Sequence, residues 1–269
     1  MTGIGAGGGA TGAFISRRTR DEKPRPPPFE AVERHELAEG RPRAAFGLFV
    51  GSVRSVAGWQ SVRLDEIEPI PVVNGTLLWR PVRRTLDIGA FGINSYIAPN
   101  AGDDVVEEHT EQSLGHEEIY IVLTGRATFT LDDEKLDAPA GTVVFVREPK
   151  VKRHAVANEP NTSVLAVGGP RDAAYEPSPW EDYFAAERHR NAGDYDAYAN
   201  ELVEAAERRP DHPATLYNLA CAEALAHRED AAVEHLRRAI ELRPSLADLA
   251  RDDEDFVFLR SRSDWPLGE

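Results

Sequence analysis

The chain has 269 residues, 41% of them hydrophobic, which is enough for one large domain or two modest domains with an apolar core. Acidic residues outnumber basic ones 46 to 31, and the formal charge of −15 disfavours nucleic acid and anionic membrane surfaces as main partners. A single cysteine, Cys221, excludes an intrachain disulfide, and no apolar run approaches the roughly 18 residues of a membrane span. These features predict a cytoplasmic protein that binds neither nucleic acid nor membrane.

Residues 1–61 are predicted to be an N-terminal extension that is disordered or poorly structured. Residues 1–30 are glycine-rich, then charged, then proline-rich. Such a composition cannot bury enough apolar surface to offset the entropy of ordering the chain. Residues 31–61 show no strong helical or strand periodicity.

A β-domain is predicted for residues 62–175. Short segments rich in Val, Ile, Phe, Tyr and Thr alternate there with Gly, Pro, Asn and Asp, a pattern typical of strands joined by tight turns. Asp132–Glu134 are interpreted as a hairpin turn. The predicted strands fall within residues 75–82, 90–99, 117–125, 127–139, 142–148, 152–158 and 162–169. Many short strands at this spacing predict a sandwich or a barrel.

An all-α domain is predicted for residues 176–269. Two segments end in Arg-Pro, at Pro210 and Pro244, and the apolar positions ahead of each recur at the same distance, Leu202 matching Leu236. This period of 34 residues is typical of tetratricopeptide helix pairs. Because a free-standing array needs about three repeats, an ordinary alanine-rich helical hairpin remains the alternative. Such helices could bind a peptide or protein partner, cover the barrel or form a subunit contact.

The stretch "HTEQSLGHEEIYIVLTG", residues 109 to 125, holds most of the residues that could carry chemistry. Strand alternation places His109 and Glu111 on one face, and a turn at residues 112–115 would form a hairpin that brings them opposite Glu118. His154 begins a further strand. Imidazole and carboxylate groups that converge from three strands inside a barrel would suit a divalent transition metal and a small-molecule ligand.

The spacing Gly102 … His109-x-Glu111 … Glu118-x6-Gly125, followed by Pro139-x-Gly141 … His154-x3-Asn158, resembles the two motifs of the cupin superfamily. The resemblance covers roughly residues 62 to 172. It implies a double-stranded β-helix, or jelly-roll, barrel. The predicted fold is therefore of the α+β multidomain class, a cupin barrel followed by an all-α tetratricopeptide-like domain.

The resemblance implies that His109, Glu118 and His154 are metal ligands. Glu111 stands where the family usually has a second histidine, so it carries over as a substitute ligand, and His116 is a rival if the intervening loop folds back. This set would favour Fe, Mn, Ni or Zn over Ca or Mg, because imidazole is a borderline and not a hard ligand. The alternative is a barrel that has lost its metal, with both histidines hydrogen-bonded to neighbours.

Three hypotheses about function follow. The first is a metal-dependent cupin enzyme, such as a dioxygenase, isomerase or decarboxylase, with Tyr120 as a candidate catalytic residue for proton transfer. The second is a non-catalytic barrel that senses or stores a small ligand. The third is an interaction protein whose helices bind a peptide or protein partner while the barrel forms a homodimer. The sequence leaves open whether the protein is an enzyme.

Overall fold

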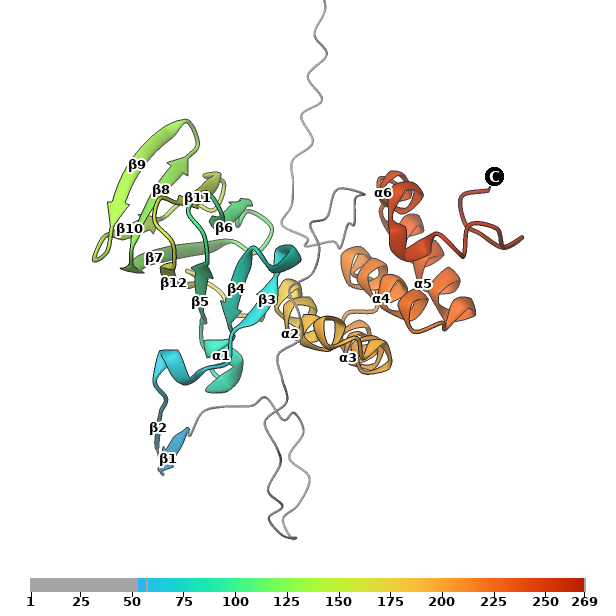
Figure 1. Ribbon diagram of the computed structural model, residues 1–269, viewed down its shortest axis with the longest axis horizontal. Helices are drawn as coiled ribbons and strands as arrows, with labels where there is room; N and C mark the ends of the chain where they lie inside the picture. Colours follow the sequence, from blue (N-terminus) through green and yellow to red (C-terminus); the bar gives the residue numbers. More distant parts are fainter. Residues whose placement is uncertain (1–52, 57, 269) are drawn as a thin grey trace, which may run out of the picture.

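The computed structural model describes residues 53–56 and 58–268, and it shows a β-sandwich followed by a helical region (Figure 1). All strand pairings within these residues are antiparallel. The larger sheet has the strand order β10 (Val143–Val146), β7 (His116–Thr124), β12 (Thr162–Pro170), β5 (Gly92–Ala98), β4 (Leu77–Arg80), β3 (Ile70–Val72). The smaller sheet has the order β6 (Asp104–His109), β11 (Arg153–Ala157), β8 (Arg126–Leu131), β9 (Glu134–Pro139).

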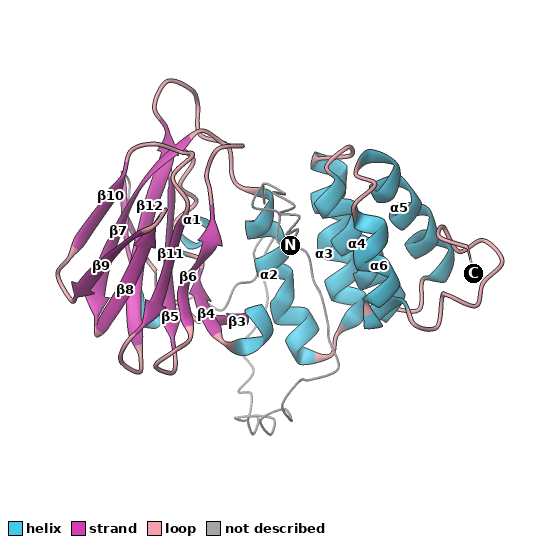
Figure 2. Cartoon of the chain, turned by 90° about the horizontal axis from the view of Figure 1, so that it is seen from above, coloured by secondary structure: helices cyan, strands magenta, loops and turns pink. Residues whose placement is uncertain are grey.

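The two sheets pack face to face because each strand turns one apolar side toward the other sheet (Figure 2). On β8 the alternate residues Ala127 and Phe129 are buried, and on β10 Val144 and Val146 are buried. These side chains belong to one apolar core between the sheets. The coarse prediction of an antiparallel β-domain followed by helices is confirmed.

The predicted strands appear in the structure within a few residues of their expected bounds. The predicted hairpin turn joins β8 to β9, with Asp132 at a φ of 52°. Gly125 at the end of β7 has a φ of +71°, and a Cβ at this position would lie 3.0 Å from Thr162 Cα. The turn that ends β7 therefore requires a glycine.

Two parts of the sequence-based description differ from the structure. The segments around His109 and Glu118 do not form a hairpin, because β6 belongs to the smaller sheet and β7 to the larger one, and they approach each other across the sandwich. A short hairpin, β1 (Arg54–Val56) and β2 (Trp59–Ser61), lies within the predicted N-terminal extension. Residues 1–52 lie outside the described residues.

The helical region begins with two antiparallel helix pairs, α2 (Pro179–Ala192) with α3 (Tyr195–Arg208), and α4 (Pro213–Leu225) with α5 (Glu229–Leu242). It ends with α6 (Leu246–Asp252) and a 3₁₀ turn, Glu254–Phe256. The remaining short helices precede β5: α1 (Val82–Thr85) and two 3₁₀ turns, Leu64–Glu66 and Val73–Gly75.

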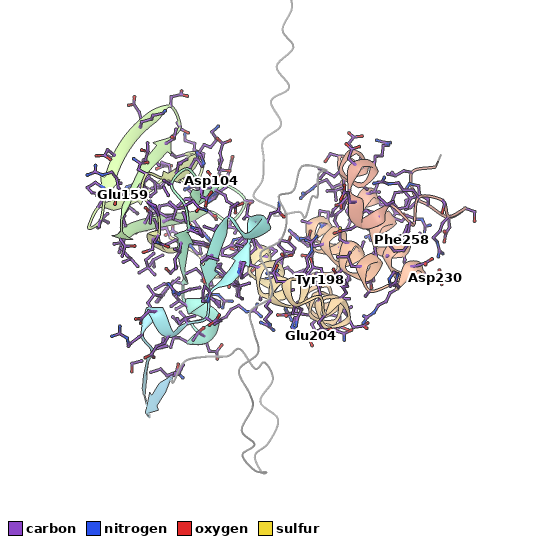
Figure 3. All side chains as sticks on the ribbon, in the orientation of Figure 1. Asp104, Glu159, Tyr198, Glu204, Asp230 and Phe258 are labelled. Carbon is purple, nitrogen blue, oxygen red and sulfur yellow. The ribbon has the colours of Figure 1, made fainter. Side chains whose placement is uncertain are left out.

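The repeat seen in the sequence corresponds to buried positions on α3 and α5. Leu202 and Leu236 are both buried in the helical core, which also contains Tyr198, labelled in Figure 3. Whether the helices are tetratricopeptide repeats stays a prediction. Among the described residues, no helix is both long enough and apolar enough to cross a membrane.

Helix α2 attaches the helical region to the barrel. Its Trp180 and Phe184 make edge-on contacts with Trp79 of β4, with ring centroids 5.9 and 5.7 Å apart. Buried ion pairs flank this aromatic contact, including one between Arg83 and Glu181 with an N–O distance of 2.6 Å. The first helix after the β-domain therefore packs against the sheet as well as against the other helices.

Candidate functional site

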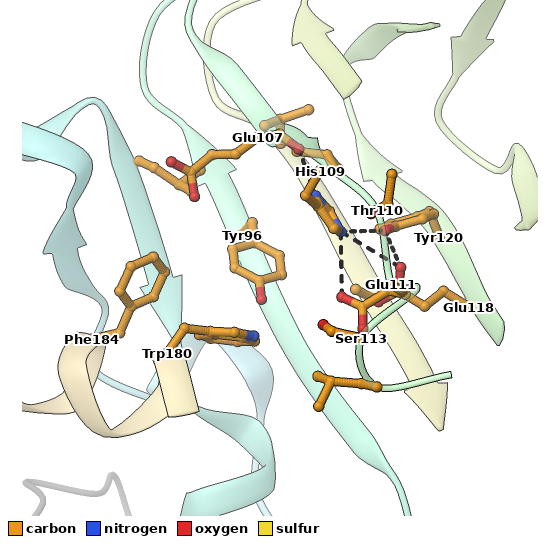
Figure 4. A pocket seen from close by; sticks show the side chains of 15 residues that line it. Tyr96, Glu107, His109, Thr110, Glu111, Ser113, Glu118, Tyr120, Trp180 and Phe184 are labelled. Carbon is orange, nitrogen blue, oxygen red and sulfur yellow. Dashed lines mark hydrogen bonds and ion pairs between the residues drawn. The ribbon is translucent and has the colours of Figure 1, made fainter. Parts of the chain in front are cut away.

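A cavity of about 70 Å³ opens between the two sheets at the end that α2 covers (Figure 4). This volume holds a few water molecules or a small ligand. Its walls come from strands of both sheets, from the loop after β6 and from α2. The lining side chains include Leu77, Tyr96, Val105, Val106, Glu107, His109, Glu111, Ser113, Glu118, Tyr120, Trp180 and Phe184.

Three of the predicted ligands converge on this cavity, and we call them the barrel cluster: His109, Glu111 and Glu118. His109 Nε2 lies 3.6 Å from Glu111 Oε1 and 3.8 Å from Glu118 Oε2. One ligating atom from each residue lies within 4.8 Å of the others. The structure thus brings together an imidazole from one sheet, a carboxylate from the other and a carboxylate from the loop between them.

A backbone hydrogen bond orients the His109 ring. Nδ1–H donates to the carbonyl oxygen of Glu107 at 2.7 Å, which leaves Nε2 facing the two carboxylates. Burial alone would lower the pKa of His109, but the hydrogen bond and charge of Glu118, with smaller contributions from Glu107 and Glu111, raise it above its ordinary value. Burial raises the pKa of the Glu107 carboxyl itself to about 7, opposed by the charge of His109.

Glu118 is held by two side chains from the barrel interior. The Tyr120 hydroxyl donates a hydrogen bond to its Oε2, and the guanidinium Nε of Arg153 lies 3.6 Å from the same oxygen. Burial alone would raise the pKa of Glu118, but interactions with His109, Tyr120 and Arg153 hold it below its ordinary value. Gly168 stands beside Glu118 in the β12–β7 ladder, and a Cβ there would lie 2.7 Å from Glu118 Cγ. A glycine at this position makes room for the carboxylate.

Tyr120, the predicted catalytic candidate, lies in the same wall. Its hydroxyl is 3.5 Å from His109 Nε2 in addition to its bond to Glu118. Burial and the negative charge of Glu118 raise the Tyr120 pKa well above its ordinary value, so the phenol stays protonated and acts as a donor. This contact makes it a residue that orients Glu118, and proton transfer by it stays a prediction.

The rival ligand His116 contacts the other oxygen of Glu111. Its Nδ1 lies 3.3 Å from Glu111 Oε2, in a geometry that leaves this buried oxygen without a hydrogen bond among the described residues. The His116 ring stacks on Tyr175 with the centroids 5.6 Å apart. His116 therefore lies behind Glu111 as a neighbour, outside the group of three converging donors.

His154 does not reach the cluster, and Arg153 takes the inward position beside it. In the β11–β6 ladder Arg153 pairs with His109, and its side chain is fully buried. Because side chains alternate along a strand, His154 lies on the outer face, where its Nε2 is 2.8 Å from Asp104 Oδ1. Asp104 is labelled in Figure 3. The placement implied by the family resemblance is therefore corrected for His154, and the barrel interior holds a fixed cation instead.

The sequence reasoning missed four residues that shape the site. Arg153 was overlooked because the family resemblance pointed to its neighbour His154. Glu107, which lies two residues before His109, was not considered as a site residue. Trp180 and Phe184 were assigned to a separate helical domain, although the aromatic segment "YEPSPWEDYF" at residues 175 to 184 was a signal that it packs on something apolar.

A second group of potential ligands lies in the helical region, the helical cluster Cys221, Asp253 and Asp255. All three are buried. Asp253 Oδ2 accepts hydrogen bonds from Tyr217 at 2.8 Å and from the Cys221 thiol at 3.8 Å, and its Oδ1 accepts the backbone N–H of Asp255. Burial and the nearby carboxylates raise the pKa of Cys221 well above its ordinary value. These hydrogen bonds connect α4 to the segment after α6 and stabilise the packing of the helical region.

Comparison with family models and with curated proteins gave no match. Solved structures do match, and several of them are described as cupin proteins. A predicted oxalate decarboxylase from Thermotoga maritima is 23% identical, with 41% of this chain and 99% of that chain covered and a TM-score of 0.35. A sugar phosphate isomerase from a cupin superfamily, from Silicibacter pomeroyi, is 17% identical over 44% and 83%, with a TM-score of 0.35. An RmlC-like cupin protein from Desulfovibrio desulfuricans is 21% identical over 44% and 96%, with a TM-score of 0.30.

This chain itself has two antiparallel sheets with an attached helical region. These three matches cover at most 44% of this chain.

Proposed function

We propose that the barrel binds a divalent transition metal through His109, Glu111 and Glu118, together with a small organic ligand in the adjoining cavity. The observation that carries this proposal is the convergence of three ligating atoms on one wall of the cavity. One imidazole and two carboxylates suit Mn, Fe, Ni or Zn. Three protein ligands would leave coordination positions open for water or ligand.

The residues present fit such an ion. Ligand atoms about 2.1 Å from a metal lie roughly 3.0–3.4 Å from one another, and the observed separations of 3.6 and 3.8 Å are a few tenths of an ångström wider. The His109 hydrogen bond to a carbonyl is the kind of support that orients metal-bound histidines. Glu111 Oε2, on the side of His116, accepts no hydrogen bond among the described residues, so this carboxylate is not already held there by a hydrogen bond.

When bound, the metal would act as a Lewis acid that polarises an oxygen of the ligand. The protein residues would have separate tasks. Tyr120 and Arg153 hold the Glu118 carboxylate in place, and Trp180 and Phe184 exclude water from the cavity. Isomerisation, decarboxylation and oxygenation are the reaction classes that we propose to test, and a non-catalytic ligand-binding barrel is the alternative.

Away from the metal, the cavity favours an uncharged and apolar part of the ligand. Its walls carry aromatic and aliphatic side chains with three carboxylates, and no lysine or arginine lines it within the described residues. Arg153 is shielded from the cavity behind Glu118. An anionic group of the ligand would be repelled by Glu107 and Glu111 unless it bound directly to the metal.

Metal analysis of the untagged, full-length protein tests the proposal. We expect near-stoichiometric binding of Mn, Fe, Ni or Zn, and at least a hundredfold weaker binding in His109→Ala and Glu118→Gln. His154→Ala is the matched control, because this histidine is on the outer face of the same barrel and should leave binding unchanged. Absence of metal after reconstitution, or equal loss in the control, would refute the proposed site.

The helical region supports a second candidate function, peptide binding by tetratricopeptide-like helices. A cavity of about 560 Å³ lies over α3, α4 and α5, with apolar side chains such as Leu219 beside Arg237 and Arg238. Screening a peptide library against the full chain would test it. A selected peptide should bind Arg237→Glu more weakly than the parent, whereas Arg251→Glu on α6 should bind it as the parent does. An equal loss of affinity in both variants would show that the peptide responds only to the net charge of the protein and does not bind in this cavity.

A further inference from the structure

A second, smaller cavity adjoins the barrel cavity, and we call it the polar chamber. Its volume is about 40 Å³, which is enough for a few water molecules or one small chemical group. The walls that it shares with the barrel cavity include four residues labelled in Figure 4: Tyr96, Glu111, Glu118 and Trp180. Its remaining polar walls are formed by Asn94, His116, Tyr175, Ser178 and Glu181. A ligand in the barrel cavity therefore lies next to this chamber.

The Asn94 amide on β5 brings an unused hydrogen-bond acceptor to the chamber. Asn94 is only 4% exposed, and its Nδ2 donates to Glu181 Oε1 at 3.2 Å. Because a carboxylate only accepts hydrogen bonds, this contact fixes which end of the amide faces Glu181. The other end, Oδ1, is buried and accepts no hydrogen bond among the described residues. A buried acceptor of this kind costs stability unless a donor reaches it.

Two further polar groups on the chamber walls are not used by the fold. Glu111 Oε2, which lies 3.3 Å from His116 Nδ1, is the second buried oxygen without a hydrogen bond among the described residues. Ser178 is buried directly before α2, but its hydroxyl makes no capping hydrogen bond to this helix. A serine at this position usually caps the helix. The chamber therefore has two acceptors and one hydroxyl that are available to a guest.

The charges around the chamber are balanced without a charged guest. Glu181 is buried and pairs with Arg83 at an N–O distance of 2.6 Å. Glu111 and Glu118 are the proposed metal ligands. No lysine or arginine lines the chamber within the described residues, so an anionic group would meet acceptors only. The guest that fits is a neutral group that donates a hydrogen bond.

We propose that the polar chamber is a subsite for a hydroxyl group of the ligand. This inference rests on the proposed binding of a small organic ligand in the barrel cavity. A hydroxyl donates to an acceptor such as Asn94 Oδ1 and accepts from a donor such as the Ser178 hydroxyl. A methyl group or a halogen of similar size would leave the Asn94 acceptor unsatisfied. The protein therefore selects ligands with an apolar body and a hydroxyl group beside it.

Tyr175 shields the chamber from solvent. It lines the chamber and stacks on His116, and it is partly buried, whereas residues 171–174, 176 and 177 are exposed. Gly92 makes room for it, because a Cβ at that position would lie 2.9 Å from the Tyr175 hydroxyl oxygen. A hydrogen bond made inside a shielded site is stronger than the same bond in water. The shielding therefore increases the discrimination that Asn94 gives.

Ligand-observed NMR titration of the full chain with two matched probes tests this subsite. The probes are butan-1-ol and 1-fluorobutane, which have the same apolar body and differ in the hydroxyl. Each is titrated with Zn²⁺ added and with metal removed. We expect the parent to bind butan-1-ol about tenfold more tightly than 1-fluorobutane in both conditions, which is the effect of one satisfied buried acceptor.

Asn94→Leu should abolish this preference, because it removes the acceptor and keeps a side chain of similar size. Ser95→Ala is the matched control and should keep the preference. Ser95 is the next residue on β5, is buried and also has a hydroxyl without a hydrogen bond among the described residues, but it does not line the chamber. Ser178→Ala serves as a second variant in case Asn94→Leu does not fold, and it should reduce the preference about threefold. Circular dichroism checks the fold of each protein.

Three outcomes would overturn the subsite, and they differ in what they say about the proposed function. Equal binding of both probes by the parent would overturn the subsite alone. A preference that requires Zn²⁺ and persists in Asn94→Leu and Ser178→Ala would place the hydroxyl on the metal, which supports the metal site and overturns the subsite. Binding of neither probe, with or without Zn²⁺, would overturn both the subsite and the proposed ligand cavity.

Discussion

The barrel cluster and the helical cluster bring ligating atoms comparably close together, but they differ in how those atoms are used. In the helical cluster, both Asp253 oxygens accept hydrogen bonds, and Asp255 pairs with Arg190 at 3.2 Å. In the barrel cluster, His109 Nε2 and the two carboxylates face a cavity, and Glu111 Oε2 accepts no hydrogen bond among the described residues. A close group of His, Cys, Asp or Glu side chains therefore indicates a metal site only under two conditions. Some of their lone pairs must not already accept hydrogen bonds, and a cavity must lie next to them.

Among substitutions that test the difference between the two clusters, Arg153→Met is expected to change the stability of the protein most. Removing a fully buried cation leaves the Glu118 charge stabilised only by His109 and Tyr120, so the metal-free protein should lose about 3 kcal/mol of unfolding free energy. Adding a divalent metal should recover part of this loss, because the metal would replace the missing positive charge. Urea unfolding with and without Mn²⁺ measures both quantities.

His154→Gln is the control for Arg153→Met, since the two residues are adjacent on β11 and face opposite ways. Its stability should change by less than about 1 kcal/mol, because exposed ion pairs contribute little. A loss in Arg153→Met no larger than in this control would show that the buried cation has no part in holding the barrel cluster.

Asp253→Ala should have the next largest effect on stability, and it should not change metal binding. The substitution leaves the Tyr217 hydroxyl and the Asp255 N–H without their buried acceptor, which should cost about 2–3 kcal/mol. Metal binding should be the same as in the parent, which titration calorimetry would check. A lowered metal affinity would break the comparison, because it would make the helical cluster a binding site.

His235→Gln tests a histidine and carboxylate pair that adjoins no ligating group of the barrel. His235 Nδ1 lies 2.7 Å from Glu223 Oε2, and this hydrogen bond raises the His235 pKa, against the effect of burial. The stabilisation is then fully present below about pH 6.5 and is lost as the pH rises through the raised pKa. The stability of parent and variant should therefore converge at higher pH in urea unfolding, and a constant difference would contradict the assignment.

The smallest effect is expected at Cys221, where we predict none. Co²⁺ added to the folded protein should give no sulfur-to-metal charge-transfer absorption, since the thiol is buried and donates to Asp253. Cys221→Ala should have the same cobalt spectrum as the parent. A charge-transfer band that disappears in this variant would show that the helical cluster takes up metal.

The candidate site was partly predictable because some of its constraints are local. His109, Glu111 and Glu118 were identified from the spacing of a resemblance to cupin motifs, and the structure does bring them together. His154 was placed wrongly because a one-residue change in register inverts every side chain of a strand. In β11 the inward positions hold Arg153 and two alanines, so the apolar pattern gave no indication of which face is buried.

The sequence by itself determined where most strands of the β-domain and their turns lie, because strand alternation and turn residues act over a few neighbouring residues. The β1–β2 hairpin and β3 were not predicted. Only the tertiary structure decided that β6 and β7 meet across two sheets, that Trp180 of the helical region closes the barrel cavity, and that a polar chamber adjoins this cavity. These arrangements depend on packing between segments far apart in the chain, and no local pattern specifies which distant surface a side chain will contact.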